Sequence, residues 1–149
     1  MLPRNLLVPL DLGPHAAEVV AYAVALADRL DARLHVLHSI AWPLIGAEIP
    51  VTISSAALAE IMAQARSELE QLTSAHAGRI PAEAIEVQSG DPRTNIIATA
   101  ERLGADLIVM GTHGRRGVAR MWLGSVAEQV ARVAPCPVLL VRSGTATAP

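Results

Sequence analysis

The chain has 149 residues, of which 52% are hydrophobic and 17% charged, with a net charge of −2 and a mean hydropathy of +0.38. This length suits one compact domain, and this composition excludes a disordered chain. The longest uncharged stretch, 34–47, is too short for a membrane span, which needs roughly 18 apolar residues. All 12 basic residues are arginine, which excludes a lysine-dependent P-loop or Schiff base, and aromatic residues at 2% argue against a nucleic-acid binder.

Five short apolar runs alternate with stretches of helical periodicity. Two of the runs, 107–110 and 138–141, are continuously apolar, as is typical of strands covered on both faces. The predicted strands are 5–10, 34–40, 84–88, 106–110 and 137–142.

Four helices are predicted between and after these strands. The first covers 16–30 with Gly13 as a possible cap and Pro14 at its first position, and the second covers 58–72 behind Ser54. The third begins at Asp91-Pro92 and ends at Gly104. The fourth follows Gly124-Ser125 and stops at Pro135. The inward positions expected on the second and fourth helices are Leu58, Ile61, Met62, Ala65, Leu69, Leu72, Val126, Val130 and Val133.

This alternation predicts an α/β fold: a single doubly wound domain with a five-stranded parallel sheet in the order 3-2-1-4-5 and helices on both faces. The domain is expected to cover 1–142 and to be followed by a disordered tail at 143–149. The apolar segment 41–53 has no clear period, and both a packed connector and a lid over a ligand stay open.

Ligands of open parallel sheets bind beyond the carboxyl ends of the strands, where the strand order reverses. In the predicted order that point lies between the first and fourth strands. The stretch 111–125, GTHGRRGVARMWLGS, follows the fourth strand and leads into a helix. Its glycines permit close backbone approach, its helix start offers free N–H groups, and its arginines raise the local potential. It predicts a phosphate site, although a solvated turn is the alternative.

The pattern Gly111-x2-Gly114-x9-Gly124-Ser125 resembles the nucleotide-binding signature of the ATP-binding branch of the universal stress protein family. The resemblance extends over nearly the whole chain. It includes LLVPLD at 6–11, LHSI at 37–40, SGDP at 89–92, GADLIVMGTHG at 104–114 and CPVLLVR at 136–142. One departure is Gly13, since the family often carries serine two residues after the aspartate.

The resemblance implies an ATP site with roles for individual residues. Asp11, with Pro9 and Leu10, would contact the nucleoside, and the backbone at Ser39 would meet adenine. Met110 and Gly111 would line the ribose and the first phosphate. The residues expected around the triphosphate are His113, Gly114, Arg115, Gly124, Ser125 and Val126. A Mg²⁺ or Mn²⁺ ion would be carried by the phosphates rather than by a protein cage.

Some of these residues have simpler explanations. A carboxylate such as Asp11 commonly accepts N–H bonds within a turn, and a loop histidine such as His113 is usually exposed and idle. His35 and His38 have opposite parity on one strand, which excludes a metal pair. The lone cysteine, Cys136, cannot form an internal disulfide and is expected to pack in the core.

The leading functional interpretation is a cytoplasmic, ATP-binding stress-response or regulatory protein. No catalytic residue is assigned, because a clear general base is missing apart from His113. A slow ATPase or adenylyl-transfer enzyme is the first alternative, and a nucleotide-free dimeric interaction module is the second. The apolar strand 138–141 is expected at the sheet edge, where it would pair with a second copy to form a homodimer. No nucleic acid or membrane partner is expected.

Overall fold

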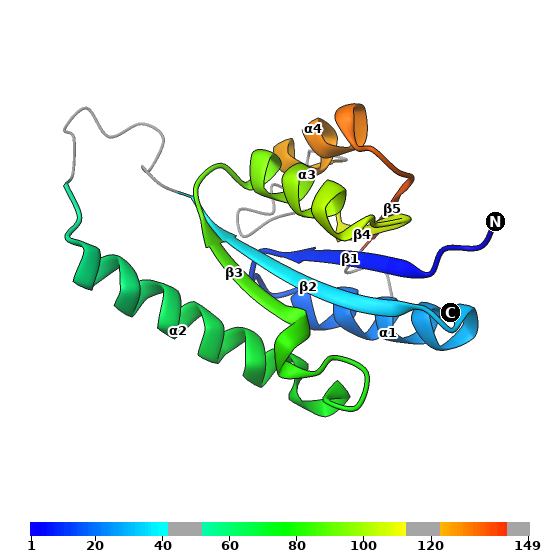
Figure 1. The fold of residues 1–149 in the computed structure, drawn as a ribbon, viewed down its shortest axis with the longest axis horizontal. Coiled ribbons are helices and arrows are strands. Elements are labelled where there is room, and N and C mark those ends of the chain that lie inside the picture. The colour runs from blue at the N-terminus through cyan, green and yellow to red at the C-terminus, as the bar shows by residue number, and fades with distance from the viewer. Residues whose placement is uncertain (42–51, 113–122, 143–149) are drawn as a thin grey trace.

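The computed structural model describes residues 1–41, 52–112 and 123–142, which form one parallel sheet between two layers of helices (Figure 1). The expected tail at 143–149 and most of the 41–53 segment lie outside these residues. The elements in chain order are β1 (Asn5–Leu10), α1 (Ala16–Leu30), β2 (Arg33–Ile40), α2 (Ser55–Thr73), the 3-10 turns η1 (Ser74–His76) and η2 (Ala82–Ala84), β3 (Ile85–Ser89), α3 (Pro92–Leu103), β4 (Leu107–Gly111), α4 (Ser125–Val133) and β5 (Val138–Val141).

The sheet has five parallel strands in the order β3-β2-β1-β4-β5, which confirms the predicted fold class and strand order. The chain builds outward from β1 to β3, then crosses to the other side of β1 to add β4 and β5. The strand order therefore reverses between β1 and β4, with β3 and β5 at the two edges.

Alternate residues of the strands feed two separate hydrophobic cores. On β1, Leu6, Val8 and Leu10 pack with α1 and α2, whereas Leu7 belongs to the core under α3 and α4. Figure 1 shows this division, with α1 and α2 on one side of the sheet and α3 and α4 on the other. Because side chains alternate along a strand, a continuously apolar run such as Leu6–Val8 fills both layers.

Helix ends follow local hydrogen-bond chemistry. The Ser54 hydroxyl accepts from the Ala57 N–H at 3.1 Å, and the Asp91 carboxylate accepts from the Thr94 N–H at 2.9 Å. Gly104 ends α3 in the left-handed conformation, with φ +59°. These three ends are as predicted.

The beginning of α1 was predicted wrongly. The residue at its N-cap is His15, and Gly13 and Pro14 lie in the turn that precedes it. The physical reason is that the Asp11 carboxylate binds the N–H of Gly13 at 2.9 Å, which assigns Gly13 to a turn after β1.

Two residues expected to point inward are exposed instead. Ile61 is 42% exposed and Val133 is 45% exposed. Ile61 lies in the N-terminal half of α2, which extends beyond the sheet in Figure 1, and Val133 is the last residue of α4. A helical period alone does not show where a helix extends beyond the sheet that would bury its apolar side.

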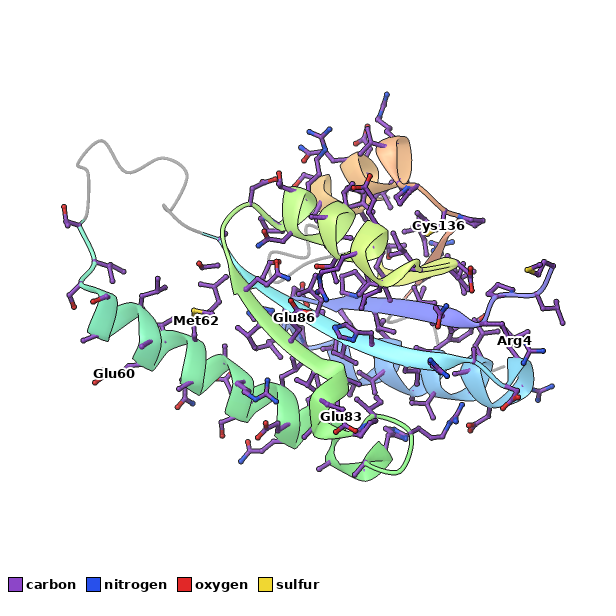
Figure 2. All side chains as sticks on the ribbon, viewed as in Figure 1. Arg4, Glu60, Met62, Glu83, Glu86 and Cys136 are labelled. Carbon is purple, nitrogen blue, oxygen red and sulfur yellow. The ribbon has the colours of Figure 1, made fainter. Side chains whose placement is uncertain are left out.

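A polar network joins β2, β3 and α3 through the Glu86 carboxylate, which Figure 2 labels on β3. Glu86 Oε2 accepts from Arg102 at 2.6 Å and lies 3.0 Å from His35 Nε2, while Oε1 accepts from Gln88. Burial raises the pKa of Glu86, but the hydrogen bonds from Gln88, His35 and Arg102 and the Arg102 charge outweigh it and hold this pKa below its ordinary value.

The Glu86 network should make stability depend on pH. Because the folded-state pKa is lowered, the unfolded chain takes up a proton first as the pH falls below about 4.5, the ordinary value. The stabilisation is complete above that pH and is lost as the pH falls through the folded-state pKa. Glu86→Gln should lower the free energy of unfolding by roughly 1–2 kcal/mol at pH 7 and by less at pH 3.5. Urea denaturation at both pH values measures this, and an equal loss at both would contradict it.

Candidate nucleotide site at the carboxyl edge

The ladder between β1 and β4 stops before either strand ends. Its register pairs Leu6 with Leu107 and Leu7 with Ile108, whereas β1 pairs with β2 as far as Leu10 and His38. One residue in the unpaired part is Pro9, which has no backbone N–H to donate. Beyond Leu7 and Ile108 the hydrogen-bond ladder between the two strands therefore ends. It ends at the point where the strand order reverses, which is the expected place for a ligand.

Asp11 directly follows β1 at this edge. Its Oδ1 accepts from the Gly13 N–H at 2.9 Å, which closes a turn in which Leu12 has φ +59°. Its Oδ2 is buried and has no hydrogen-bond partner among the residues that the structure describes. Burying a carboxylate oxygen without a hydrogen-bond donor costs free energy. An N–H or O–H group of a ligand at this position would therefore stabilise Oδ2.

The N-terminus of α4 lies beside the end of β4. The Thr112 N–H donates to the Val141 carbonyl at 3.1 Å, and the Gly124 N–H donates to the Thr112 carbonyl. The N-cap of α4 is Gly124, which has no side chain with which to cap the helix. The N–H groups of its first turn, from Ser125 to Ala127, therefore point out of the helix at its positive end, where an anion is stabilised.

The end of β2 forms the other side of this region. The Ile40 carbonyl accepts from the Gly90 N–H at 2.9 Å and so points toward β3. Because successive carbonyls of a strand point to opposite neighbours, the Ser39 carbonyl points toward β1, beyond its last paired residue. The Ser39 hydroxyl accepts from Asn95 Nδ2 at 3.3 Å, which joins β2 to the first turns of α3.

The residues expected at the site divide into three groups. Pro9, Leu10 and Met110 are buried near the strand ends, so their side chains belong to the cores while their backbones reach the edge. The exposed or half-buried residues at the same edge are Asp11, Ser39, Gly111, Gly124, Ser125 and Val126. The remaining predicted residues, His113, Gly114 and Arg115, lie outside the described residues.

Sequence reasoning missed three residues at this edge: His38, Asn95 and Thr112. The buried His38 donates its Nδ1–H to the Leu10 carbonyl at 2.7 Å and so holds the peptide that precedes Asp11. Each contact depends on pairing across strands or between a helix and a strand. The available signal was a polar residue within an apolar strand, as with His38 after Val36 and Leu37. Asn95 follows the polar residues Arg93 and Thr94 and offers no such signal.

A cavity of about 690 Å³ lies at the amino-terminal ends of the strands, away from the candidate site. Its lining includes Arg4, Arg33 and Arg79. Arg79 pairs with Asp28 at 2.6 Å and donates to the Ala32 carbonyl at 3.0 Å. The helix α1 also ends here, and the negative end of a helix disfavours an anion. Arg4 likewise donates to the Asp31 carboxylate at 3.4 Å, so Arg4 and Arg79 bind carbonyl and carboxylate groups of the chain itself.

Among the residues that the structure describes, no group of three or more His, Cys, Asp or Glu side chains is placed to hold a metal ion. His35 bonds Glu86 under α3 and His38 bonds Leu10, which confirms that these histidines occupy opposite faces of β2. Over the same described residues, no helix is long and apolar enough to cross a membrane.

The sheet and its two helix layers define a doubly wound α/β protein whose strand order reverses between β1 and β4. A model of the universal stress protein family matches residues 3–142, and the chain therefore belongs to that family. Universal stress protein A homolog 1 of Coxiella burnetii is 35% identical over 140 residues, covering 93% of this chain and 95% of that protein. Universal stress protein MJ0531 of Methanocaldococcus jannaschii is 33% identical over 144 residues, covering 95% and 83%.

Solved structures share this fold. A protein named MJ0577 superposes with a TM-score of 0.81 at 23% identity, covering 98% of this chain and all of that one. UspA from Lactobacillus plantarum gives 0.68 at 25% identity, covering 93% and 97%. A universal stress protein described in complex with cAMP gives 0.58 at 22% identity, covering 97% and 100%.

The two oxygens of Asp11 should be separable by mutation. Asp11→Ala removes the acceptor for the Gly13 N–H and should lower the free energy of unfolding by roughly 1 kcal/mol. Asp11→Asn keeps an oxygen for that bond and removes the charge, so its stability should stay within a few tenths of a kcal/mol of the parent's. Urea denaturation without added ligand measures both. Equal losses in the two variants would show that Oδ1 does not hold the turn.

Proposed function

We propose that this universal stress protein binds ATP at the carboxyl edge of its sheet and acts as a regulatory stress-response protein. The observation that carries the proposal is the buried Oδ2 of Asp11, which has no hydrogen-bond partner among the described residues. The nucleoside part of ATP offers hydroxyl and amino donors, and one of them would satisfy this oxygen. The bond would be charge-assisted and therefore strong.

Adenine would lie at the end of β2. The Ser39 carbonyl faces the region beyond Leu10, where β1 offers it no paired residue. A strand end of this kind recognises a base through its backbone, so the side chain at Ser39 is free for other contacts. Met110 and Gly111, at the end of β4, would border the ribose and the first phosphate.

The triphosphate would lie on the first turn of α4. The N–H groups of Ser125 and Val126 have no partner within the helix, and the Ser125 hydroxyl is exposed. His113, Gly114 and Arg115, which the family resemblance adds to this part of the site, complete the proposed set. A Mg²⁺ or Mn²⁺ ion would be bound through the phosphate oxygens.

The fold match to a protein described with cAMP indicates that this architecture accommodates an adenine nucleotide. The single cysteine and the family membership support a cytoplasmic location. Binding rather than turnover is proposed as the function, because phosphoryl transfer needs a positioned base and the sequence offers no clear one apart from His113.

Substitutions at the start of α4 test the site. Gly124 has φ −66° and ψ 152°, a conformation that valine adopts readily, so Gly124→Val should fold normally while its side chain blocks the phosphates. Ser125→Ala should weaken ATP binding by about 1.5–3 kcal/mol, the contribution of one hydrogen bond to a charged group. Calorimetric titration with ATP and Mg²⁺ measures both effects, and circular dichroism checks the fold.

The matched control is Gly78→Val, since a Cβ at Gly78 meets no atom within 4 Å and this glycine precedes Arg79 at the other end of the sheet. This variant should bind ATP like the parent protein. ATP binding by folded Gly124→Val with parent affinity would place the nucleotide elsewhere.

We propose further that the chain forms a homodimer through β5. Both β3 and β5 are edge strands, but β3 carries Glu86 and Gln88 whereas β5 reads VLLV and is half-buried at every position. An apolar edge with unpaired backbone groups favours pairing with another strand, and two-fold symmetry is the commonest result.

Leu140→Lys tests the dimer by placing a charge on this edge. Light scattering at micromolar concentration should give the mass of a dimer for the parent protein and of a monomer for this variant. Ile61→Lys, which adds the same charge to an exposed position of α2, should stay dimeric. A monomeric parent protein would contradict the proposed interface.

A further inference from the structure

The side-chain amide of Asn95 is held in one orientation at the edge proposed for adenine. Its Nδ2 lies 3.2 Å from the Ser89 carbonyl oxygen and 3.3 Å from the Ser39 hydroxyl. A carbonyl oxygen only accepts hydrogen bonds, so the NH₂ group must be the one that faces Ser89. Both amide protons are thereby used on the ends of β3 and β2.

The orientation leaves Oδ1 as an available acceptor. Among the described residues no donor is bonded to this oxygen, and Asn95 is half-buried rather than enclosed. The backbone around it is also fixed, because the Gly90 N–H bonds the Ile40 carbonyl at 2.9 Å and Asp91 caps α3 immediately before it. The edge therefore presents a positioned acceptor beside the Ser39 peptide.

We propose that Asn95 selects adenine over 6-oxopurines by presenting Oδ1 to the group at position 6 of the base. This inference rests on the proposed nucleotide site and deepens it. Adenine carries an amino donor at position 6, whereas guanine and hypoxanthine carry an oxygen there, which only accepts.

Selection requires that the amide cannot simply rotate to suit either base. A flip would bring Oδ1 against the Ser89 carbonyl oxygen, placing two acceptors in contact, and would remove the donor from the Ser39 hydroxyl. A 6-oxopurine therefore meets an acceptor that is unable to become a donor. Specificity then comes from repulsion of the wrong base as well as attraction of the right one.

The test compares ATP, GTP and ITP by calorimetric titration of the parent protein and Asn95→Ala. ITP has the 6-oxygen of guanine without its 2-amino group, so it isolates position 6. The parent protein should bind ATP at least about tenfold more tightly than GTP or ITP, a factor of ten being 1.4 kcal/mol. In Asn95→Ala the ATP-to-GTP and ATP-to-ITP affinity ratios should each fall about tenfold.

Thr94→Val is the matched control, since it alters the same turn of α3 by removing the hydroxyl that bonds Asp91 at 2.7 Å. It should keep the parent's affinity ratios. If Asn95→Ala retains those ratios, or if the parent protein binds ITP as tightly as ATP, the assignment to Asn95 is wrong while the nucleotide site stands. If the parent protein binds none of the three nucleotides, the proposed function itself fails.

Discussion

The early end of the β1–β4 ladder is the constraint on which the candidate site depends. Two strands that stay paired to their last residues would use their own backbone groups and leave little for a ligand. Here β1 and β4 are paired only at Leu6 and Leu7 of β1, and Pro9 cannot donate a hydrogen bond further along. Asp11, Gly111 and the start of α4 lie at the end of the sheet where this ladder has already ended.

The two hydrophobic cores hold the ends of β1 and β4 in place although the ladder between these strands ends early. Leu6, Val8, Leu37 and Ile108 are almost completely buried, and the strands that carry them are covered on both faces. Rigid packing on either side fixes the positions of the strand ends, so the polar atoms beyond them are held without help from a ligand. His38 contributes in the same way at the carboxyl ends of the strands, because its buried side chain donates a hydrogen bond to the Leu10 carbonyl.

The helices and most of their buried positions could be predicted because each rests on a local pattern. The strand order could be predicted from the alternation of strands and helices and from the handedness of their connections. Alternating elements, the Asp91 cap and Gly104 are all recognised within a few residues. The prediction for Gly13 was wrong because the same local pattern fits a helix cap and a turn. The predictions for Ile61 and Val133 were wrong because their burial depends on how far the neighbouring layer extends. The roles of His38 and Asn95 arise from strand register and helix docking. A polar residue in an apolar strand can mark a position such as His38, but it does not identify the partner.

The bond between the Gly124 N–H and the Thr112 carbonyl has a consequence for what a ligand at this edge has to do. It ties the start of α4 to the end of β4 through two backbone groups that both lie among the described residues. The protein's own backbone, rather than a ligand, therefore holds the positive end of α4 beside the sheet. A ligand at this position then loses less binding free energy to the ordering of the chain than one that has to bring the two elements together.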